Sequence, residues 1–396
     1  MSVKQPLVRP DDLVRWAEAE RTGRPRRLAR LRATMAEAGV DAYFGVRREN
    51  TRYLTGFVLG DGEEKVAGNS GWFLVTPDEV VVLADSRYAE QAAEECPEAR
   101  IVDVYHDLPA RWPETIAGCW RVAAEAGFIA QATWARLVAG APSVELVPVE
   151  GWVEADRAVK EPEEIERIAA ACTVADAALE ALLPQMRPGV TEAELALALE
   201  WTMRTSGAEA LAFDVAVLAG PRAALPHGSP GPRPVAAGQV LLFDFGAQVA
   251  GYRSDMTRTL FVGEPTARDL ELYRLVAAAQ EAALDALAEA AARGESPSGR
   301  AMDGIARAVI ERAGHGPHFG HGLGHGIGLA THELPTLGKR AGDEPLPTPT
   351  VFSVEPGVYL PGETGVRIED LVAFDPSVGR CERLTRFPRE VIVVGA

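Results

Sequence analysis

The sequence has few cysteines and no long apolar run, and each shortage excludes a class of protein. Its four cysteines, Cys96, Cys119, Cys172 and Cys381, lie far apart without C-x-x-C spacing, so neither a disulfide framework nor a thiolate zinc site is indicated. The segment MSVKQPLVRPDDLVRW lacks the apolar run of a signal peptide, and nowhere do about 18 consecutive apolar residues occur. We therefore expect a cytoplasmic protein without a membrane span, whose thiols are inert and partly buried.

Basic side chains are also in the minority. The sequence has 40 lysines and arginines against 57 aspartates and glutamates, a formal net charge of -17, so its surface would repel phosphate backbones and anionic lipid headgroups. We therefore expect no nucleic-acid partner and no membrane partner. Carboxylates that bind cations inside a folded protein are neutralised there, which would account for part of this acidity.

The sequence does have enough apolar residues for two cores. Its 396 residues are 47% hydrophobic and 24% charged, which is the balance of a globular protein that divides into two domains. The pattern changes around GWVEADRAVKEPEEIERI, residues 151–168. We expect one domain over residues 1–154 and a second over residues 155–396.

The first domain is predicted to mix helices and strands. Residues 24–39 carry Leu28, Leu31 and Met35 at helical spacing and end in a glycine, which predicts an amphipathic helix. Three short apolar runs that predict strands, and one short helix, follow at residues 41–46, 71–76, 79–85 and 89–95. This alternation indicates a mixed α/β domain.

The second domain is predicted to be an α+β unit. Pro162 opens a long helix that continues to about Leu183, and Thr191 with Glu194 forms a capping box at the start of the next helix. Two further helices and four antiparallel strand segments are predicted at residues 268–293, 298–313, 240–246, 258–263, 350–360 and 367–374. Two strand pairs of this kind, each with an acid in each strand, would bring four carboxylates together.

Four acids lie in or beside these apolar strands. Asp244 stands inside VLLFDFG and Glu355 inside VFSVEPGVYL, where an unpaired ionised carboxylate is penalised by the loss of water. Asp255 and Glu369 sit on the adjacent strand of each pair. The structural alternative is that each acid is a buried carboxylate paired with one of three nearby arginines, Arg253, Arg258 or Arg367.

Histidines cluster in the same half of the chain. Six of the seven lie between His227 and His332, and four of these are packed into HFGHGLGHGIGLATHEL, residues 318–334. The alternating glycines exclude a stable helix, so His321 and His325 are not a metal-binding pair on one helical face. The backbone there is expected to be a loop or irregular strand that approaches another segment closely.

One histidine of this segment is the best ligand candidate. Imidazole together with carboxylates is the ligand set of transition metals such as Mn, Co, Zn and Fe. His325 lies at the centre of the glycines, whereas His315 and His318 are expected to be solvated loop residues. No GxSxG nucleophile motif competes, and neither GxGxxG nor GxxxxGK[ST] occurs in this stretch.

Six short segments resemble the prolidase and aminopeptidase P branch of the pita-bread metallopeptidases, a family that also includes methionine aminopeptidase. They are LPHG (225–228), GYRSDMTRT (251–259), GHGIGL (324–329), HELP (332–335), EPGVY (355–359) and RIED (367–370). NTRYLTGF (50–57) and DSRYAEQA (85–92) resemble the creatinase-type N-terminal domain of that branch. The resemblance spans nearly the whole chain and implies an α+β protein, with a creatinase-type mixed α/β domain followed by a pita-bread catalytic domain.

The resemblance also implies a set of metal ligands. The family's order of Asp, Asp, His, Glu and Glu is matched by Asp244, Asp255, His325, Glu355 and Glu369. Asp244 would bind one divalent ion, His325 and Glu355 would bind the other, and both remaining acids would bridge them. Manganese is the expected metal. Two such ions lower the pKa of a bound water and polarise a carbonyl, as amide hydrolysis needs, and Glu355 would also shuttle a proton.

Residues that bind no metal are implicated as well. His227 and His332 match family histidines that contact the substrate and the developing oxyanion. Four more residues are expected to bind substrate or to orient the ligands through hydrogen bonds: His321, Arg367, Tyr252 and Tyr359. For Tyr359, plain core packing is the alternative.

The implied substrate is a proline-containing di- or oligopeptide, hydrolysed at the bond before proline. Some prolidases have an arginine directly after the HExP word that binds the free carboxylate of a dipeptide, whereas here Thr336 follows Pro335. Arg340 is the alternative candidate for this contact. An Xaa-Pro dipeptidase is favoured on overall length, and a longer substrate, as for aminopeptidase P, is favoured if Arg340 does not reach the site.

Two other functional classes stay open. One is an amidohydrolase or lyase that acts on a small non-peptide metabolite, because proteins of this fold include ectoine hydrolase and a sulfonium lyase. The other is a non-catalytic binding module, because some pita-bread proteins have lost their metals, although five intact ligands argue against it. The resemblance further implies a homodimer.

Overall fold

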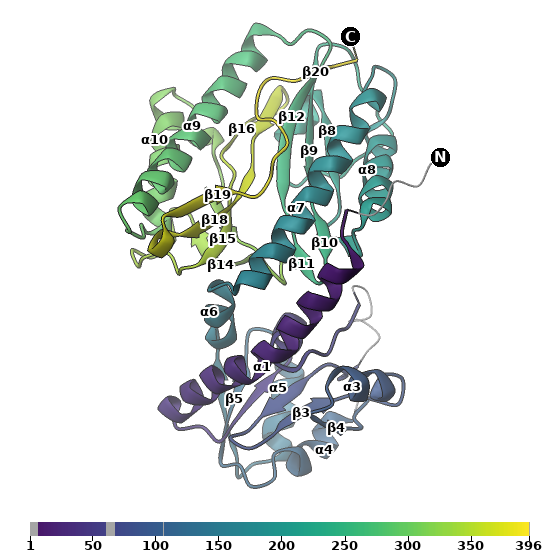
Figure 1. Ribbon diagram of the computed structural model, residues 1–396, viewed down its shortest axis with the longest axis vertical. Helices are drawn as coiled ribbons and strands as arrows, with labels where there is room; N and C mark the ends of the chain where they lie inside the picture. The colour runs from purple at the N-terminus through teal and green to yellow at the C-terminus, as the bar shows by residue number, and fades with distance from the viewer. Residues whose placement is uncertain (1–6, 61–67, 106, 396) are drawn as a thin grey trace. The chain divides into compact units, whose positions relative to one another are not determined.

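The computed structural model describes residues 7–60, 68–105 and 107–395 (Figure 1). The chain forms two compact units, one of residues 17–156 and the other of the residues up to Trp16 together with those from Arg157 onward. Residues 7–16, which the sequence assigned to the first domain, lie with the second unit. The reason is that Trp16 is 4% exposed within a core cluster of that unit, where its carbonyl accepts a hydrogen bond from Arg167.

The N-terminal unit is a mixed α/β domain, as predicted, and the structure shows that it is built on one mixed sheet. Its strand order is β4-β3-β2-β1-β5-β6, with β2 antiparallel to both neighbours and the other pairs parallel. The strands are β1 (Ala42–Gly45), β2 (Phe73–Val75), β3 (Val80–Leu83), β4 (Arg100–Val102), β5 (Arg121–Glu125) and β6 (Glu145–Val149). The helices are α2 (Arg48–Thr55), α3 (Ala89–Glu95), α4 (Leu108–Thr115), α5 (Gln131–Gly140) and α6 (Trp152–Ala158).

The first helix is longer than predicted. Helix α1 spans Pro10–Ala38, so the predicted start near residue 24 was wrong. The start signals are Pro10 at the first helical position and Asp11 and Asp12 in the first turn, where acids interact favourably with the helix dipole. The predicted end was correct, because Gly39 follows the last helical residue in a left-handed conformation.

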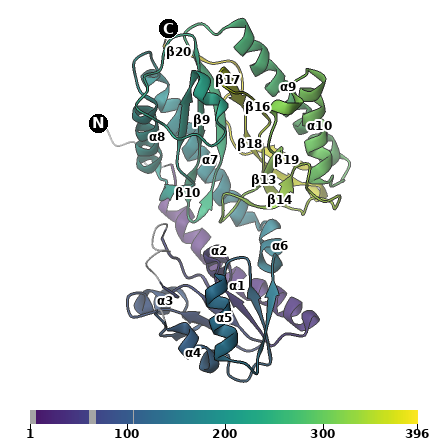
Figure 2. The ribbon, with the colours of Figure 1, turned by 180° about the vertical axis from the view of Figure 1, so that it is seen from behind.

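The second unit contains four long helices and several short sheets (Figure 2). The helices are α7 (Pro162–Leu182), α8 (Glu192–Ser206), α9 (Ala267–Ala292) and α10 (Gly299–Arg312). One group of strands comprises β7 (Ala210–Leu211), β8 (Ala216–Ala219), β9 (Gln239–Phe245), β10 (Ala247–Val249), β11 (Tyr252–Arg253), β12 (Met256–Val262) and β20 (Val393–Val394). The other comprises β13 (Gly324–Gly326), β14 (Glu333–Leu337), β15 (Thr350–Val354), β16 (Gly357–Leu360), β17 (Thr364–Arg367), β18 (Asp370–Asp375) and β19 (Arg380–Arg383).

Helix α7 begins where the sequence predicted. Pro162 occupies its first turn with Glu163 and Glu164, and Glu161 with Glu164 forms a capping box. Within the described residues, Pro162–Gln185 is also long and apolar enough to pass as a membrane span by length and composition, with 44% of that window buried. Core helices pass the same test, and Leu179 and Leu182 of this helix pack in a core cluster.

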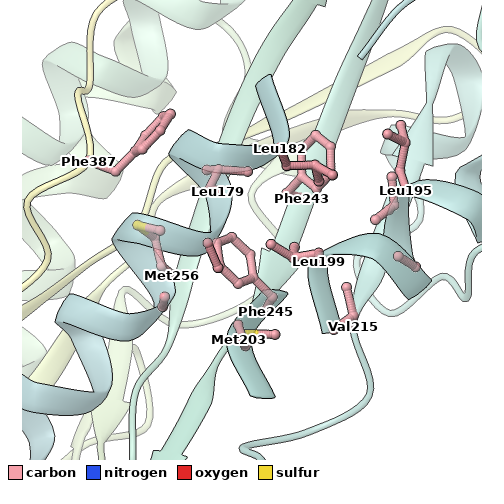
Figure 3. Close-up of a cluster of buried hydrophobic side chains, with 14 of the residues drawn as sticks. Leu179, Leu182, Leu195, Leu199, Met203, Val215, Phe243, Phe245, Met256 and Phe387 are labelled. Atoms are coloured by element: carbon pink, nitrogen blue, oxygen red, sulfur yellow. The ribbon is translucent and has the colours of Figure 1, made fainter. Parts of the chain in front are cut away.

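Strand β9 separates the two core clusters of this unit. Leu241, Phe243 and Phe245 join the cluster formed with α7 and α8, which Figure 3 shows. Val240 and Leu242 join the cluster formed with α9 and α10. Because side chains alternate along a strand, Asp244 lies on the side of Val240 and Leu242 and faces the second half of the unit.

Each of the strands predicted at residues 350–360 and 367–374 is interrupted. Strand β15 ends at Val354 and β16 begins at Gly357, and β17 ends at Arg367 before β18 begins at Asp370. The two predicted acids therefore lie in the breaks rather than within strands. Pro356 has no N–H for a ladder, and the N–H groups of Glu355 and Glu369 donate instead to the carbonyls of Leu323 and Thr257.

The core assignment predicts different effects for two leucines of α8. Leu199 is fully buried and Leu197 is 67% exposed, so Leu199→Ala should lower the free energy of unfolding by about 2–5 kcal/mol through the cavity it leaves. Leu197→Ala should change it by about 0.5 kcal/mol or less. Denaturant unfolding of both variants measures this, and equal effects would contradict the packing described here.

Candidate active site

Five side chains from separate segments line one cavity of the second unit. The cavity has a volume of about 1180 Å³. The five are the predicted metal ligands Asp244, Asp255, His325, Glu355 and Glu369. They come from β9, the residue before β12, β13 and the two strand breaks, so the two antiparallel strand pairs each deliver two acids, as the sequence predicted.

The imidazole of His325 lies among the acids. Its Nε2 is 3.3 Å from Oε1 of Glu355 and 3.8 Å from Oδ2 of Asp255. Three ligand atoms, one each from Asp255, His325 and Glu369, lie within 4.8 Å of one another. This is close enough for one cation to contact all three. The Nδ1 atom is 3.1 Å from the carbonyl oxygen of Gly326, which orients the ring with Nε2 towards the acids.

The glycines beside His325 are required by close packing. A Cβ atom on Gly324 would lie 1.9 Å from the carbonyl oxygen of Ser353, and one on Gly326 would lie 2.0 Å from that of Leu334. These glycines allow β13 to fit between β15 and β14. The predicted close approach of this segment to its neighbours is thereby confirmed.

Two of the acids each have an oxygen that is ready to accept a cation. Oδ1 of Asp255 and Oε1 of Glu369 are buried, and the structure gives neither a hydrogen-bond partner. The other oxygen of Glu369 accepts a bond from the hydroxyl of Thr257 at 2.7 Å. Since buried carboxylate oxygens are rarely left without a partner, these two orphaned atoms fit a bound metal ion.

The fourth acid, Asp244, is paired with an arginine. NH2 of Arg367 donates to Oδ2 of Asp244 at 2.5 Å, NH1 donates to the hydroxyl of Tyr359 at 2.7 Å, and Nε donates to the hydroxyl of Thr257 at 2.8 Å. The Tyr359 hydroxyl also lies 2.9 Å from Nε2 of His321. One oxygen of Asp244 thus forms the arginine pair considered above, and Tyr359 does more than pack in the core.

The other two arginines have different main partners. Arg258 pairs with Asp370 at 2.7 Å and donates to the carbonyl of Glu369 at 2.5 Å. Arg253 donates to the carbonyl of Ala212 at 2.7 Å. Arg258 therefore neutralises Asp370, and Arg253 is engaged by a backbone carbonyl.

Burial and mutual repulsion shift the pKa values of the acids. Burial, and then the charge of Glu355, raises the pKa of Glu369 to about 8, and burial with the charge of Glu369 raises that of Asp255 well above its ordinary value. Burial acts against ionisation of the Glu355–His325 pair, yet their hydrogen bond lowers the pKa of Glu355 to about 2 and raises that of His325 to about 9. Four ionised carboxylates therefore need added positive charge.

The remaining predicted residues do not all reach the cavity. His227, His321 and His332 line it, and the rings of His332 and His325 lie 4.1 Å apart between centroids. Tyr252 is placed elsewhere, because its buried hydroxyl donates to Glu164 at 2.7 Å. Arg340 is exposed in the turn after β14 and is not among the lining residues.

Sequence reasoning missed several residues of the site. Thr257 binds both Glu369 and Arg367, and its position two residues after Asp255 on an alternating strand was the available signal. The cavity wall also includes Leu197 and Phe213, which belong to no recognisable motif. Leu197 comes from α8 and Phe213 from the segment between β7 and β8, so their meeting depends on tertiary packing that no local pattern indicates.

Comparison with known proteins matches both parts of the chain. Residues 166–376 match metallopeptidase family M24, and residues 27–159 match the creatinase/prolidase N-terminal domain. A Bacillus subtilis peptidase, YqhT, is 34% identical over 370 residues, which cover 93% of this chain and 100% of that protein.

Solved structures are similar over nearly the same length. The Xaa-Pro dipeptidase from Bacillus anthracis is 33% identical with a TM-score of 0.83, covering 93% of this chain and 99% of that one. The X-Pro aminopeptidase from Thermotoga maritima is 35% identical with a TM-score of 0.81 and the same coverage. These likenesses extend over both parts of the chain.

Replacing the candidate ligands should remove bound metal. We expect Asp255→Asn, Glu369→Gln and His325→Ala each to lower the affinity for divalent cations by about tenfold to a hundredfold or more, because each removes a donor from the cluster. Metal content after dialysis, measured by elemental analysis, checks this. The matched control is Glu363→Gln, an exposed acid in the turn between β16 and β17, which should keep full metal content.

Metal binding should also depend on pH. Below a pH of about 8 the metal-free protein holds a proton on Glu369, and below about 9 it holds one on His325, so a cation must displace these protons to bind. Affinity should therefore fall as the pH falls, by roughly tenfold per pH unit for each proton displaced. Calorimetric titration in buffers of different ionisation enthalpy measures the released protons, and pH-independent binding without proton release would contradict the electrostatics described here.

Proposed function

Because this chain belongs to metallopeptidase family M24, we propose that it is a metal-dependent Xaa-Pro peptidase, which hydrolyses the bond before a proline. One observation carries the proposal most directly: four carboxylates and His325 converge on a buried point where Asp255 and Glu369 each have an oxygen without a partner. The names of the similar solved structures, an Xaa-Pro dipeptidase and an X-Pro aminopeptidase, support the substrate class.

The cofactor we propose is a pair of divalent cations, with manganese the expected metal and Co, Zn or Fe the alternatives. The four carboxylates and His325 would hold them, with Asp255 and Glu369 shared between both. Four negative charges match two divalent cations, and the orphaned oxygens offer the needed ligand atoms. When bound, such a pair supplies a nucleophile at neutral pH and polarises the scissile carbonyl.

Three side chains of the cavity are proposed to transfer a proton or to contact the substrate. Glu355 lines the cavity and is ionised at neutral pH, so it has an oxygen that could take a proton from the attacking water and pass it to the leaving nitrogen. The pKa of His332 is lowered by burial and by the charge of His325, which leaves a neutral imidazole to contact the substrate. His227 lines the same cavity and is proposed to bind the substrate with it.

We propose that the substrates are longer than a dipeptide. Arg367 is the one arginine among the described residues that line the cavity. Its three donor groups already bind Asp244, Tyr359 and Thr257. Thr336, at the position that follows the HELP segment, lines the wall and carries no charge. A dipeptide would leave its free carboxylate without a cation, whereas a longer peptide replaces that carboxylate with a neutral amide.

Substrate panels test both parts of the proposal. The protein loaded with manganese should hydrolyse Xaa-Pro-Yaa tripeptides faster than the matching Xaa-Pro dipeptides and should leave Xaa-Ala-Yaa peptides nearly uncut. Glu355→Gln should lower kcat by about a hundredfold or more, because it removes the proton acceptor. Hydrolysis of Xaa-Ala peptides at the same rate would refute the proline preference, and turnover only of small non-peptide amides or sulfonium compounds would favour the amidohydrolase or lyase alternative.

Assembly and location remain predictions on the same basis. We propose a homodimer, as the family resemblance implies, and a cytoplasmic location. Sedimentation of the purified protein tests the first of these.

A further inference from the structure

A buried ion cluster lies behind the segment that presents His332. The carboxylate of Glu333 is 2% exposed and contacts two cations. Arg157 donates to its Oε2 atom, and Nζ of Lys160 donates to Oε1 at 2.9 Å. The ammonium of Lys160, itself 1% exposed, also donates to the carbonyl of Arg157 at 2.6 Å. Because removal of one member would leave an uncompensated charge inside the protein, the three groups hold one another in place.

The cluster is joined to the backbone on both sides of His332. A Cβ atom on Gly328 would lie 2.4 Å from Oε1 of Glu333, so this carboxylate packs directly on the glycine backbone. The carbonyl of Gly328 accepts a hydrogen bond from the N–H of Arg253 at 2.9 Å. Glu333 is also the residue of β14 that pairs with Gly326 of β13, next to His325.

A third cation, Arg253, holds the residue before His332. NH1 of Arg253 donates to the hydroxyl of Thr331 at 3.1 Å, and that hydroxyl donates to the carbonyl of Ala212 at 3.1 Å. His332 thus stands between two anchored neighbours, Thr331 and Glu333. His332 lies directly before β14, and its imidazole lines the cavity, whereas the carboxylate of the next residue, Glu333, is buried against Arg157 and Lys160.

We infer that Lys160 and Arg157 are positioning residues, which act through Glu333 to hold the His332 imidazole where the substrate binds. The inference rests on the proposed role of His332. Both cations belong to the RAVK segment, residues 157–160, which begins the catalytic unit where the chain leaves the N-terminal unit. A segment with no catalytic motif of its own thereby sets the place of a side chain in the active site.

The test is a double-mutant cycle on the manganese-loaded protein. Lys160→Met should lower kcat for an Xaa-Pro-Yaa peptide by about tenfold or more, because a small displacement of a substrate-contacting group is costly. KM and metal content should stay near the wild-type values. In a His332→Ala background the same substitution should change kcat by less than about twofold, because the group that it positions is already gone.

A matched control separates charge loss from positioning. Arg300→Met also removes a cation that donates to a carbonyl, that of Ala341 at 2.8 Å, and pairs with an acid, Asp343. Arg300→Met should leave kcat unchanged, both alone and in the His332→Ala background. If the effects of Lys160→Met and His332→Ala simply multiply, the positioning role is overturned.

A readout without turnover keeps this inference separate from the proposed function. The sequence has seven histidines, so NMR spectra of protein labelled in the histidine rings are simple, and the His332 signal is identified by its loss in His332→Ala. That signal should shift in Lys160→Met and stay in place in Arg300→Met. An unchanged signal refutes the positioning, whereas a shifted signal in a protein that cuts no Xaa-Pro peptide refutes only the proposed function. If Lys160→Met does not fold, Glu333→Gln, which keeps the volume and one accepting oxygen, takes its place in both measurements.

Discussion

Four carboxylates share one buried place in the catalytic unit and cannot all be ionised there without added positive charge. The cations that the chain itself brings to them are Arg367, which binds Asp244, and His325, which binds Glu355. The other two acids, Asp255 and Glu369, are left with raised pKa values and with one unpartnered oxygen each. This imbalance explains why the site needs metal ions, and it sets what the surrounding fold has to achieve.

The fold brings the candidate metal ligands together through the directions of strands, strand breaks and glycines. Strand β9 alternates its side chains between two core clusters, which sends Asp244 towards the second half of the unit. Breaks after β15 and β17 release Glu355 and Glu369 from regular pairing, and their N–H groups find partners on neighbouring segments. The glycines around His325 let three strands approach closely enough for the imidazole to reach the acids.

Local signals were sufficient for much of this arrangement. The start of α7 at Pro162, the capping box at Thr191 and the acids in apolar runs could be read from short patterns, because each depends on neighbouring residues alone. The strand breaks at Glu355 and Glu369 could not, since they depend on acceptors supplied by distant segments. Tyr252 was misplaced for the same reason, because its partner Glu164 comes from another element.

The residues with the longest separation in sequence were the least predictable. Lys160 and Glu333 lie far apart along the chain, and no sequence pattern in either segment predicts that they pair. The absence of Arg340 from the cavity wall likewise follows from the course of the chain after β14. That placement is one basis of our proposal that the substrate is longer than a dipeptide.

Metal binding by these five residues is measured most directly by anomalous diffraction from crystals of the protein grown with manganese, recorded on both sides of the Mn absorption edge. We predict two anomalous peaks among Asp244, Asp255, His325, Glu355 and Glu369, with Asp255 and Glu369 between them. A map with no peak at this point, or with manganese bound only at other surfaces of the chain, would contradict this prediction.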